Sequence, residues 1–188
     1  AILKDGLPEI DPEGARVGGF RTMVEAVAMR TTGLGVDSEV HLITEGLNGG
    51  LRLGPRRLIP VSLLAVDHGQ MVHDALERAL STESSGEFDG RFVVPMQGQT
   101  GGLSLREATV LARITAPMPL AAAMASRLEV AAMERLVARG LVMISGVTPS
   151  DASHVLGRLD AWDGTASQKA VALLAKRRNG AGDRFARD

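Results

Sequence analysis

Cysteine is absent from the sequence, and this absence removes several kinds of chemistry at once. Without thiols there are no disulfide bonds, no thiolate metal sites and no cysteine nucleophiles. A chain without disulfides fits the reducing cytosol. We therefore expect a cytoplasmic protein.

Aromatic residues are also scarce. They make up 3 % of the 188 residues, with one Trp and no Tyr. Because proteins that bind single-stranded nucleic acid stack the bases on aromatic side chains, this composition argues against such a surface.

Charge of one sign is not in excess, since 21 Lys and Arg residues stand against 22 Asp and Glu residues. The net charge of -1 creates no field that attracts nucleic acid or an anionic membrane. Long apolar runs are missing too: the stretch "APMPLAAAMASRLEVAAM" contains two prolines, an arginine and a glutamate, whereas a membrane-spanning helix needs about 20 mostly apolar residues. We expect neither membrane nor nucleic acid as a partner.

What the sequence does contain is 45 % hydrophobic residues, enough for a core. Up to about residue 95, short apolar runs alternate with glycines, a pattern that favours strands. "SEVHLIT", "EGLNGG" and "LRLGP" together predict a β-hairpin, because two alternating runs flank a turn with an Asn-Gly step. The run "VSLLAVDHGQMVHDALERAL" has apolar residues at helical spacing in its second part.

The second half of the chain is predicted to be mainly helical, after a polar connection at 81–90 and a strand at "RFVV". Ser104 and Glu107 have the spacing of a capping box, and Gly140 is placed to end a later helix. We therefore expect two segments: an α/β segment at 1–95 and a mainly helical segment at 96–188.

The order of helices in the second segment, followed by "GLVMI" as the start of a wing, is similar to a winged helix-turn-helix. A nucleic-acid-binding or protein-interaction module is therefore the alternative interpretation. The third helix sets Glu129 and Glu134 against Arg135 and Arg139. A helix that reads a DNA groove is more basic than that, so we favour packing or protein contact for this segment.

Three phrases occur in a fixed order, namely "GARVGGFRTMVEAVAMRTTGLGVDSEVHL" (14–42), "LRLGPRRLIPVSLLA" (51–65) and "GVTPSDASHVLGRLDAWD" (146–163). In this order they resemble the hydantoinase/oxoprolinase family, and specifically its large, ATP-dependent subunit. The resemblance covers most of the chain. It implies an α/β fold that is part of an actin-like ATPase, a mixed sheet with helices similar to that of sugar kinases and heat-shock chaperones.

The resemblance also implies a phosphate-binding motif of the type Asp-Ile-Gly-Gly-Thr-Thr-Thr-Asp just upstream of the segment similar to residues 1–19. The sequence begins after such a motif would end. We therefore expect a C-terminal fragment of a longer protein that is inactive alone. A longer reading frame with the motif directly before Ala1 is the corresponding test.

Members of this family use ATP and Mg²⁺ to open stable cyclic amides such as hydantoins or 5-oxoproline, usually together with a second, unlike subunit. Phosphorylation of the ring carbonyl oxygen turns a poor electrophile into one that water can attack. The resemblance thus implies a cyclic amide substrate and the cofactors ATP and Mg²⁺. The sequence itself indicates no particular set of metal ligands.

The loop "GLGVDS" contains the first group of candidate site residues, which are Gly33, Gly35, Asp37 and Ser38. Glycines let backbone N–H groups approach an anion closely, because no Cβ intervenes. By resemblance this loop lies beside the nucleotide cleft, with Asp37 holding a metal ion or a water. The departure is Val36, where the family has a further glycine, and a β-branched residue is strained at positive φ. A plain glycine turn that caps the next strand is the alternative.

Arg56 and Arg57 follow Pro55 and form the second candidate group. Guanidinium groups bind carboxylate or phosphate in a bidentate fork, which suits cofactor binding, while a solvated surface pair is the alternative. His68 and His73, each next to an aspartate, are spaced i and i+5 and do not share a helix face, so we interpret them as residues of the helix surface.

Thr148, Pro149 and Asp151 predict a helix start, with Thr148 as the N-cap and Asp151 three residues later. Asp151 and His154 are three positions apart and can share one face of that helix. The resemblance implies a catalytic or interface role for both residues. A structural pair of a histidine and a carboxylate is the alternative.

Overall fold

The computed structural model describes residues 3–8, 10–12, 16–17, 20–21, 26–27, 35–43 and 50–185, with side-chain surroundings up to residue 177. The chain divides into two compact units, 1–33 and 34–188. The first unit contains three antiparallel pairs of two-residue strands. These are β1 (Leu3–Lys4) with β2 (Leu7–Pro8), β3 (Ile10–Asp11) with β6 (Ala26–Val27), and β4 (Arg16–Val17) with β5 (Phe20–Arg21).

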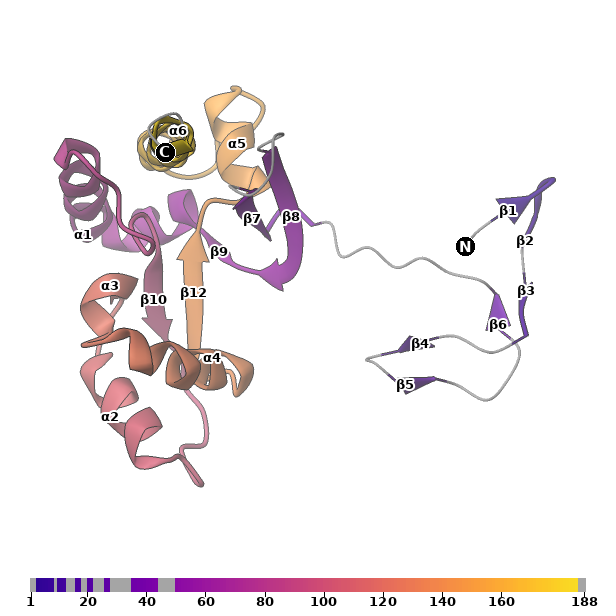
Figure 1. Ribbon diagram of the computed structural model, residues 1–188, viewed down its shortest axis with the longest axis horizontal. Coiled ribbons are helices and arrows are strands. Elements are labelled where there is room, and N and C mark those ends of the chain that lie inside the picture. Colours follow the sequence, from indigo (N-terminus) through magenta and orange to yellow (C-terminus); the bar gives the residue numbers. More distant parts are fainter. Residues whose placement is uncertain are drawn as a thin grey trace. The chain divides into compact units, whose positions relative to one another are not determined.

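The second unit is built on a mixed four-stranded sheet in the order β11-β10-β12-β9 (Figure 1). Its strands are β9 (Ile59–Pro60), β10 (Phe92–Pro95), β11 (Met118–Pro119) and β12 (Val142–Gly146). Strand β10 is antiparallel to β11 and β12, and β12 is parallel to β9. The protein is therefore of the mixed α/β class, as the sequence predicts.

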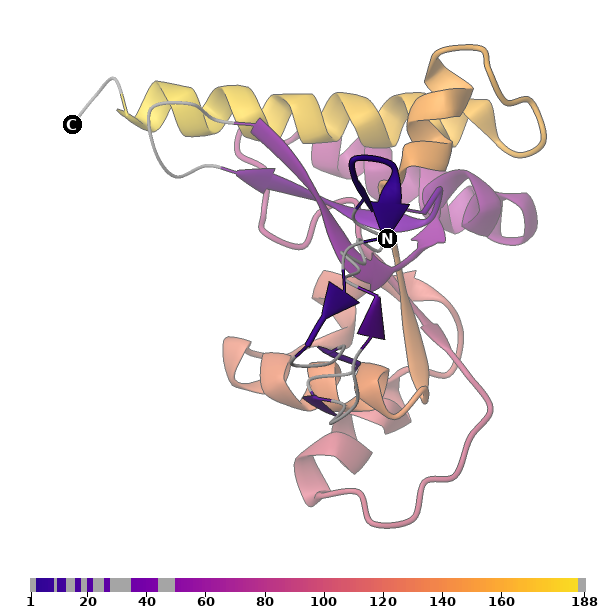
Figure 2. The same ribbon diagram turned by 90° about the vertical axis from the view of Figure 1, so that its right-hand side faces the viewer.

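Six α-helices and one 3-10 helix are present in the described part of this unit. They are α1 (Val61–Ser81), α2 (Leu105–Arg113), α3 (Leu120–Ala123), η1 (Arg127–Glu129), α4 (Val130–Ala138), α5 (Pro149–Val155) and α6 (Gly164–Phe185). Figure 2 shows α6 as the longest rod of the unit.

Successive residues of β10 point to opposite faces of the sheet, and each face has its own core. Phe92 packs with α1 and α6, around Val72, Leu76 and Leu173. Val93 packs on the other side, in the core formed with α2, α3 and α4. Strand β10 thus joins both cores, and the expected division at residue 95 passes through this sheet rather than between two compact units.

The helix ends confirm the capping predictions. Ser104 and Glu107 form both hydrogen bonds of a capping box at the start of α2, and Thr148 and Asp151 do so at the start of α5. Gly140 follows α4 with φ of +68°, a conformation that suits glycine after a helix. Helix α1 begins earlier than its clearest periodicity, at Val61, with a break at His68. Its first turns form because Val61, Leu64 and Ala65 are buried in the core with Phe92.

The region similar to a winged helix-turn-helix differs from that motif at the wing. The residues expected to begin a wing run into β12, which lies between β10 and β9 in the middle of the sheet. Leu141, Val142 and Ile144 are buried. These apolar residues complete a core, so this stretch does not form an exposed hairpin.

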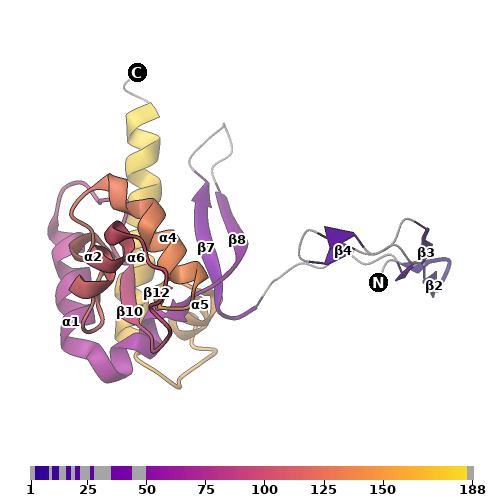
Figure 3. The same ribbon diagram turned by 90° about the horizontal axis from the view of Figure 1, so that it is seen from below.

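The predicted hairpin is confirmed as β7 (Ser38–Ile43) paired antiparallel with β8 (Gly50–Arg57). Its turn, at 44–49, lies outside the described residues. A backbone hydrogen bond from Leu58 N–H to the Asp37 carbonyl (2.8 Å) closes the base of the hairpin, and one from Ser150 N–H to the Val36 carbonyl (2.9 Å) fixes that base to α5. Figure 3 shows the two strands beside α6.

Candidate functional site

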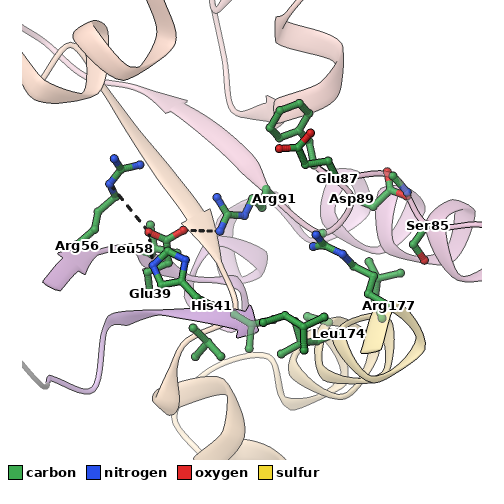
Figure 4. Close-up of a pocket in the computed structure, with 18 of the residues that line it drawn as sticks. Glu39, His41, Arg56, Leu58, Ser85, Glu87, Asp89, Arg91, Leu174 and Arg177 are labelled. Carbon is green, nitrogen blue, oxygen red and sulfur yellow. Dashed lines mark hydrogen bonds and ion pairs between the residues drawn. The ribbon is translucent and has the colours of Figure 1, made fainter. Parts of the chain in front are cut away.

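A cavity of about 1240 Å³ opens between the β7–β8 hairpin, the connection at 83–91 and α6 (Figure 4). The volume is somewhat larger than the roughly 300–1,000 Å³ of most small-molecule pockets, so a small ligand would fill only part of it. Charged side chains project into it from all three elements. The ionisable side chains in its wall include Glu39, His41, Arg56, Asp89, Arg91 and Arg177.

Glu39 is the carboxylate at the centre of the charged cluster on the cavity wall. Its side chain is only 3 % exposed, and it forms an ion pair with Arg91 across 52 positions of sequence. Its other oxygen, Oε2, lies 3.4 Å from His41 Nε2 and 4.0 Å from Arg56 Nε. A buried carboxylate is costly without partners, and these three groups supply them.

His41 lies on the same face of β7 as Glu39, because residues two apart in a strand point the same way. Its ring crosses over Gly54 of the neighbouring strand. A Cβ at position 54 would lie 2.5 Å from His41 Nε2, closer than atoms can pack. Gly54 therefore makes room for the ring, and the ring stays beside Glu39 with its edge open to the cavity.

Arg177 projects from α6 into the other side of the cavity, where Figure 4 shows its guanidinium between Arg91 and Asp89. Burial lowers the pKa of Arg177, and the positive charge of Arg91 lowers it further, while Asp89 and Glu87 act to raise it. Within the described part of the chain, no hydrogen bond or ion pair holds this guanidinium. Arg177 is thus a half-buried cation that lacks a close partner.

The acidic groups beside Arg177 have partners of their own. Asp89 Oδ2 accepts a hydrogen bond from Gly86 N–H at 2.6 Å, which fixes the turn before β10. Glu87 lies 3.3 Å from Arg127 at the rim. Neither carboxylate forms an ion pair with Arg177 among the described residues, although the negative charges of both act to raise its pKa.

The glycine loop is a closed turn. Gly35 N–H donates to Ser38 Oγ at 2.8 Å, and Ser38 N–H donates to the Gly35 carbonyl at 3.0 Å. Polar groups of Gly35 and Ser38 therefore bind one another. This arrangement favours the alternative of a plain glycine turn that caps the next strand. Val36 is exposed, and among the described non-glycine residues only Asp5 has positive φ, so valine at position 36 is not strained. Gly33 lies outside the described residues.

Asp37 and Arg57 form an ion pair at the base of the hairpin. Arg57 Nε and Nη2 both lie 2.6 Å from Asp37 Oδ2. The hydrogen bond from Arg57 lowers the pKa of Asp37, and the same bond raises the pKa of Arg57. Neither residue lines the cavity, whereas Arg56 does. Alternation along β8 thus separates the two arginines that the sequence groups together.

Asp151 is fully buried at the start of α5. Its oxygens accept hydrogen bonds from the backbone and side chains of Thr148 and Ser62, from Val61 N–H and from Ser167 Oγ, at distances from 2.7 to 3.3 Å. The carboxylate thus joins α1, α5 and α6. This arrangement favours the structural alternative for Asp151, while its catalytic role stays a prediction.

His154 is buried three residues later, 5.7 Å from the ring of Trp162 between centroids. Its Nε2 has no hydrogen-bond partner among the described residues. Asp151 and His154 share the helix face, as predicted, but no ion pair joins them in the described part of the chain. The described structure does not bring them to the cavity.

His73 is less exposed than a residue of the helix surface. Its Nε2 lies 2.9 Å from Asp163 Oδ2, and its Nδ1 accepts from Lys169 Nζ at 3.1 Å. Burial acts to raise the pKa of Asp163, but hydrogen bonds from Ala166 N–H and from His73 outweigh it, so the pKa lies below its usual value. This chain of contacts joins α1 to α6.

Glu39, His41, Arg91 and Arg177 are site residues that the sequence did not reveal. The spacing of Glu39 and His41, two apart in a predicted strand, is the one local signal for a shared face. Arg91 and Arg177 are brought in by the fold from 52 and 138 positions away from Glu39, and no local pattern indicates them.

Among the described residues, no group of three or more His, Asp or Glu side chains is arranged to hold a metal ion. Likewise, no helix in the described part of the chain has the length and apolar character needed to cross a membrane. Comparison with models of known protein families, with curated proteins and with solved structures finds no match.

Proposed function

We propose that the chain is part of a cytoplasmic, ATP-dependent hydrolase that opens cyclic amides of the hydantoin or 5-oxoproline type, within an actin-like ATPase fold. The observation that carries the proposal is the meeting of the three phrases that resemble the hydantoinase/oxoprolinase family. The first two lie close together in sequence and the third begins 81 positions after the second ends, yet residues of all three bind one another directly.

Three sets of bonds make this junction. The first and third phrases are joined by Ser150, whose N–H and hydroxyl both donate to the Val36 carbonyl, at 2.9 and 2.8 Å. The first and second are joined by the Asp37–Arg57 pair. The second and third are joined by Asp151, which accepts from Ser62 N–H and Oγ. Because the three segments contact one another in the fold, their similarities to the family are best explained together, as one resemblance.

ATP, with Mg²⁺, would supply the phosphoryl group that activates the ring carbonyl. The described residues 35–38 do not form a cradle for its phosphates, because Gly35 N–H is already bonded to Ser38 Oγ. ATP therefore enters the proposal through the resemblance alone, and no reaction step is assigned to it here. The same holds for the second, unlike subunit.

His41 is the side chain of the cavity best suited to accept a proton from an attacking water. With Nε2–H directed at Glu39, Nδ1 carries the lone pair. Glu39 is held in turn by Arg91, so the ring is oriented by a fixed carboxylate. A base oriented in this way contributes roughly 10²–10⁴-fold to a hydrolytic rate.

The test is an assay of ring opening with the longest natural polypeptide that contains this sequence, together with its unlike subunit. Hydantoin and 5-oxoproline are supplied with and without ATP, and ADP and ring-opened product are both measured. We expect product only with ATP, and a loss of about 100-fold or more in kcat for His41→Asn. His68→Asn, on the exposed side of α1, is the matched control and keeps full activity. Turnover without ATP, or no turnover of either ring, contradicts the proposal.

A further inference from the structure

We propose that the cavity beside β7 is a binding site for the carboxylate group of a singly charged organic ligand, with Arg177 as the residue that binds it. The site itself is inferred from geometry alone. The choice of ring for the ligand rests on the proposed function. Of the two substrate types proposed there, a carboxylate site selects a cyclic amide of the 5-oxoproline type over an uncharged hydantoin.

Among the described residues, Arg177 is the cation of the cavity that lacks an anionic partner. It projects into the cavity, it is half-buried, and it has no ion pair in the described part of the chain. A guanidinium removed from water without a carboxylate partner is unfavourable. An anion in the cavity supplies that partner.

Arg91 faces Arg177 in the cavity (Figure 4). Arg91 is paired with Glu39, yet its charge still disfavours the charged form of Arg177. An oxyanion bound between the two guanidiniums would offset the repulsion between their positive charges. A carboxylate matches the planar fork of a guanidinium in shape and charge.

The charges that line the cavity limit the charge of a ligand. The ionisable lining comprises four arginines and five acidic residues, which are Arg56, Arg91, Arg127 and Arg177, and Glu39, Glu83, Glu87, Asp89 and Glu134. The lining as a whole is therefore not cationic, and it disfavours a polyphosphate with several negative charges. Glu83, Asp89 and Glu134 have no ion pair among the described residues either, so the place for one negative charge is defined locally, by Arg177 beside Arg91, and not by the net charge of the lining.

An apolar surface lies next to Arg177. Leu174 lies one turn before it on α6, and Leu173 and Val40 also line the cavity. The ligand thus meets a cation at one end and hydrocarbon along its body. That combination is typical of a small organic acid rather than of a free inorganic ion.

The experiment measures binding to the 188-residue chain by isothermal titration calorimetry, with three probes. They are 5-oxoproline, its neutral amide 5-oxoprolinamide, and pyrophosphate. We expect 5-oxoproline to bind at least tenfold more tightly than either of the others, and Arg177→Gln to weaken 5-oxoproline at least tenfold. Arg158→Gln is the matched control, because Arg158 is exposed and does not line the cavity; it leaves the affinity unchanged.

The proposal is overturned by equal affinity for the acid and its amide, by tighter binding of pyrophosphate, by absence of binding, or by unchanged affinity in Arg177→Gln. Should that variant fail to fold, phenylglyoxal labelling of the unaltered chain replaces it. Bound 5-oxoproline then protects Arg177, and not Arg158, from modification as read by mass spectrometry, and equal labelling of Arg177 with and without ligand overturns the proposal.

Failure of this inference and failure of the proposed function are distinguishable. Binding that depends on Arg177, without ATP-dependent turnover, leaves the carboxylate site standing and removes the hydrolase. ATP-dependent opening of hydantoin, without preference for a carboxylate in the binding experiment, does the reverse.

Discussion

Asp151 and Ser62 are bonded twice, although 89 positions separate them. Asp151 Oδ1 accepts from Ser62 N–H at 2.9 Å and from Ser62 Oγ at 2.7 Å. The N-terminal end of α1 is thereby fixed to the first turn of α5. Because the N-terminal turn of a helix has N–H groups without partners in the helix, a carboxylate placed there satisfies them.

Asp151→Ala is expected to destabilise the fold by roughly 3 kcal/mol or more, because it leaves several buried donors without a partner and each costs about 1–3 kcal/mol. Urea unfolding followed by circular dichroism measures the change. Asp160→Ala, at an exposed position, is the matched control. A stability equal to that of the control would remove the structural role assigned to Asp151.

This pair shows how far local sequence reasoning reaches. The spacing of Thr148, Pro149 and Asp151 predicts the helix start correctly, because a capping box involves residues three apart. The same spacing contains nothing about Ser62 or Ser167, whose bonds to Asp151 form only when α1 and α6 pack against α5. A local role can be predicted from sequence, whereas a shared buried partner depends on the whole fold.

Arg113 and Glu129 join α2 to the start of α4, and their contact predicts a dependence of stability on pH. The hydrogen bond from Arg113, followed by that from Ala125 N–H, lowers the pKa of Glu129 to about 2 from its ordinary value of 4.5. A carboxyl whose pKa is depressed by folding stabilises the folded state above its unfolded pKa. That contribution is present above pH 4.5 and is lost as the pH falls towards about 2.

Glu129→Gln should therefore lower the melting temperature at pH 7, and the difference from the unaltered chain should vanish as the pH approaches about 2. Differential scanning calorimetry over this range measures both curves. Glu83→Gln, at an exposed position, corrects for the general effect of removing a charge. A difference that stays constant down to the lowest pH would contradict the assignment.

Gly90 and Gly102 offer a matched pair of substitutions, because both have φ in the left-handed region, at +73° and +74°. A Cβ at position 90 would lie 2.9 Å from Leu173 Cδ2 in the core, while a Cβ at position 102 meets open space. Alanine at either position pays the left-handed backbone cost of roughly 1–2 kcal/mol. Gly90→Ala adds the overpacking cost of about 1–3 kcal/mol.

We therefore expect Gly90→Ala to be the more destabilising of the two in chemical denaturation. The difference between the two variants isolates the contact with Leu173, since the backbone terms cancel. Equal destabilisation would show that α6 moves away from Gly90 at no cost.

The hairpin and the cavity show that local sequence patterns predict strands but not the contacts between distant segments that build a functional site. Alternation in "SEVHLIT" and "LRLGP" predicts the two strands, and alternation also explains why Arg56 faces the cavity while Arg57 bonds Asp37. The ion pair of Glu39 with Arg91 could not be predicted, because nothing in either segment indicates that the hairpin folds beside the connection that precedes β10. The resemblance points to the glycine loop at 33–38 as the site. The structure instead places Glu39 and His41, which follow that loop in β7, in the cavity wall.

Asp37→Ala separates the function of Asp37 from its contribution to stability. The Asp37–Arg57 pair is on the surface, where solvent screens its charges, so the variant should keep almost the same melting temperature. If Asp37 acts in ring opening, as the resemblance implies, the ATP-dependent rate of the longer polypeptide falls although folding is intact. Unchanged turnover would remove Asp37 from the site.

Arg57→Gln adds a readout that a purely structural role would not change. The hydrogen bond from Arg57 is the main cause of the low pKa of Asp37, so its loss raises that pKa towards the ordinary value. If activity requires the charged carboxylate, the acidic limb of the pH–rate profile shifts to higher pH in Arg57→Gln, and the rate at neutral pH is retained because Asp37 remains ionised there. A profile with its acidic limb unmoved would show that the ionisation of Asp37 does not control the reaction.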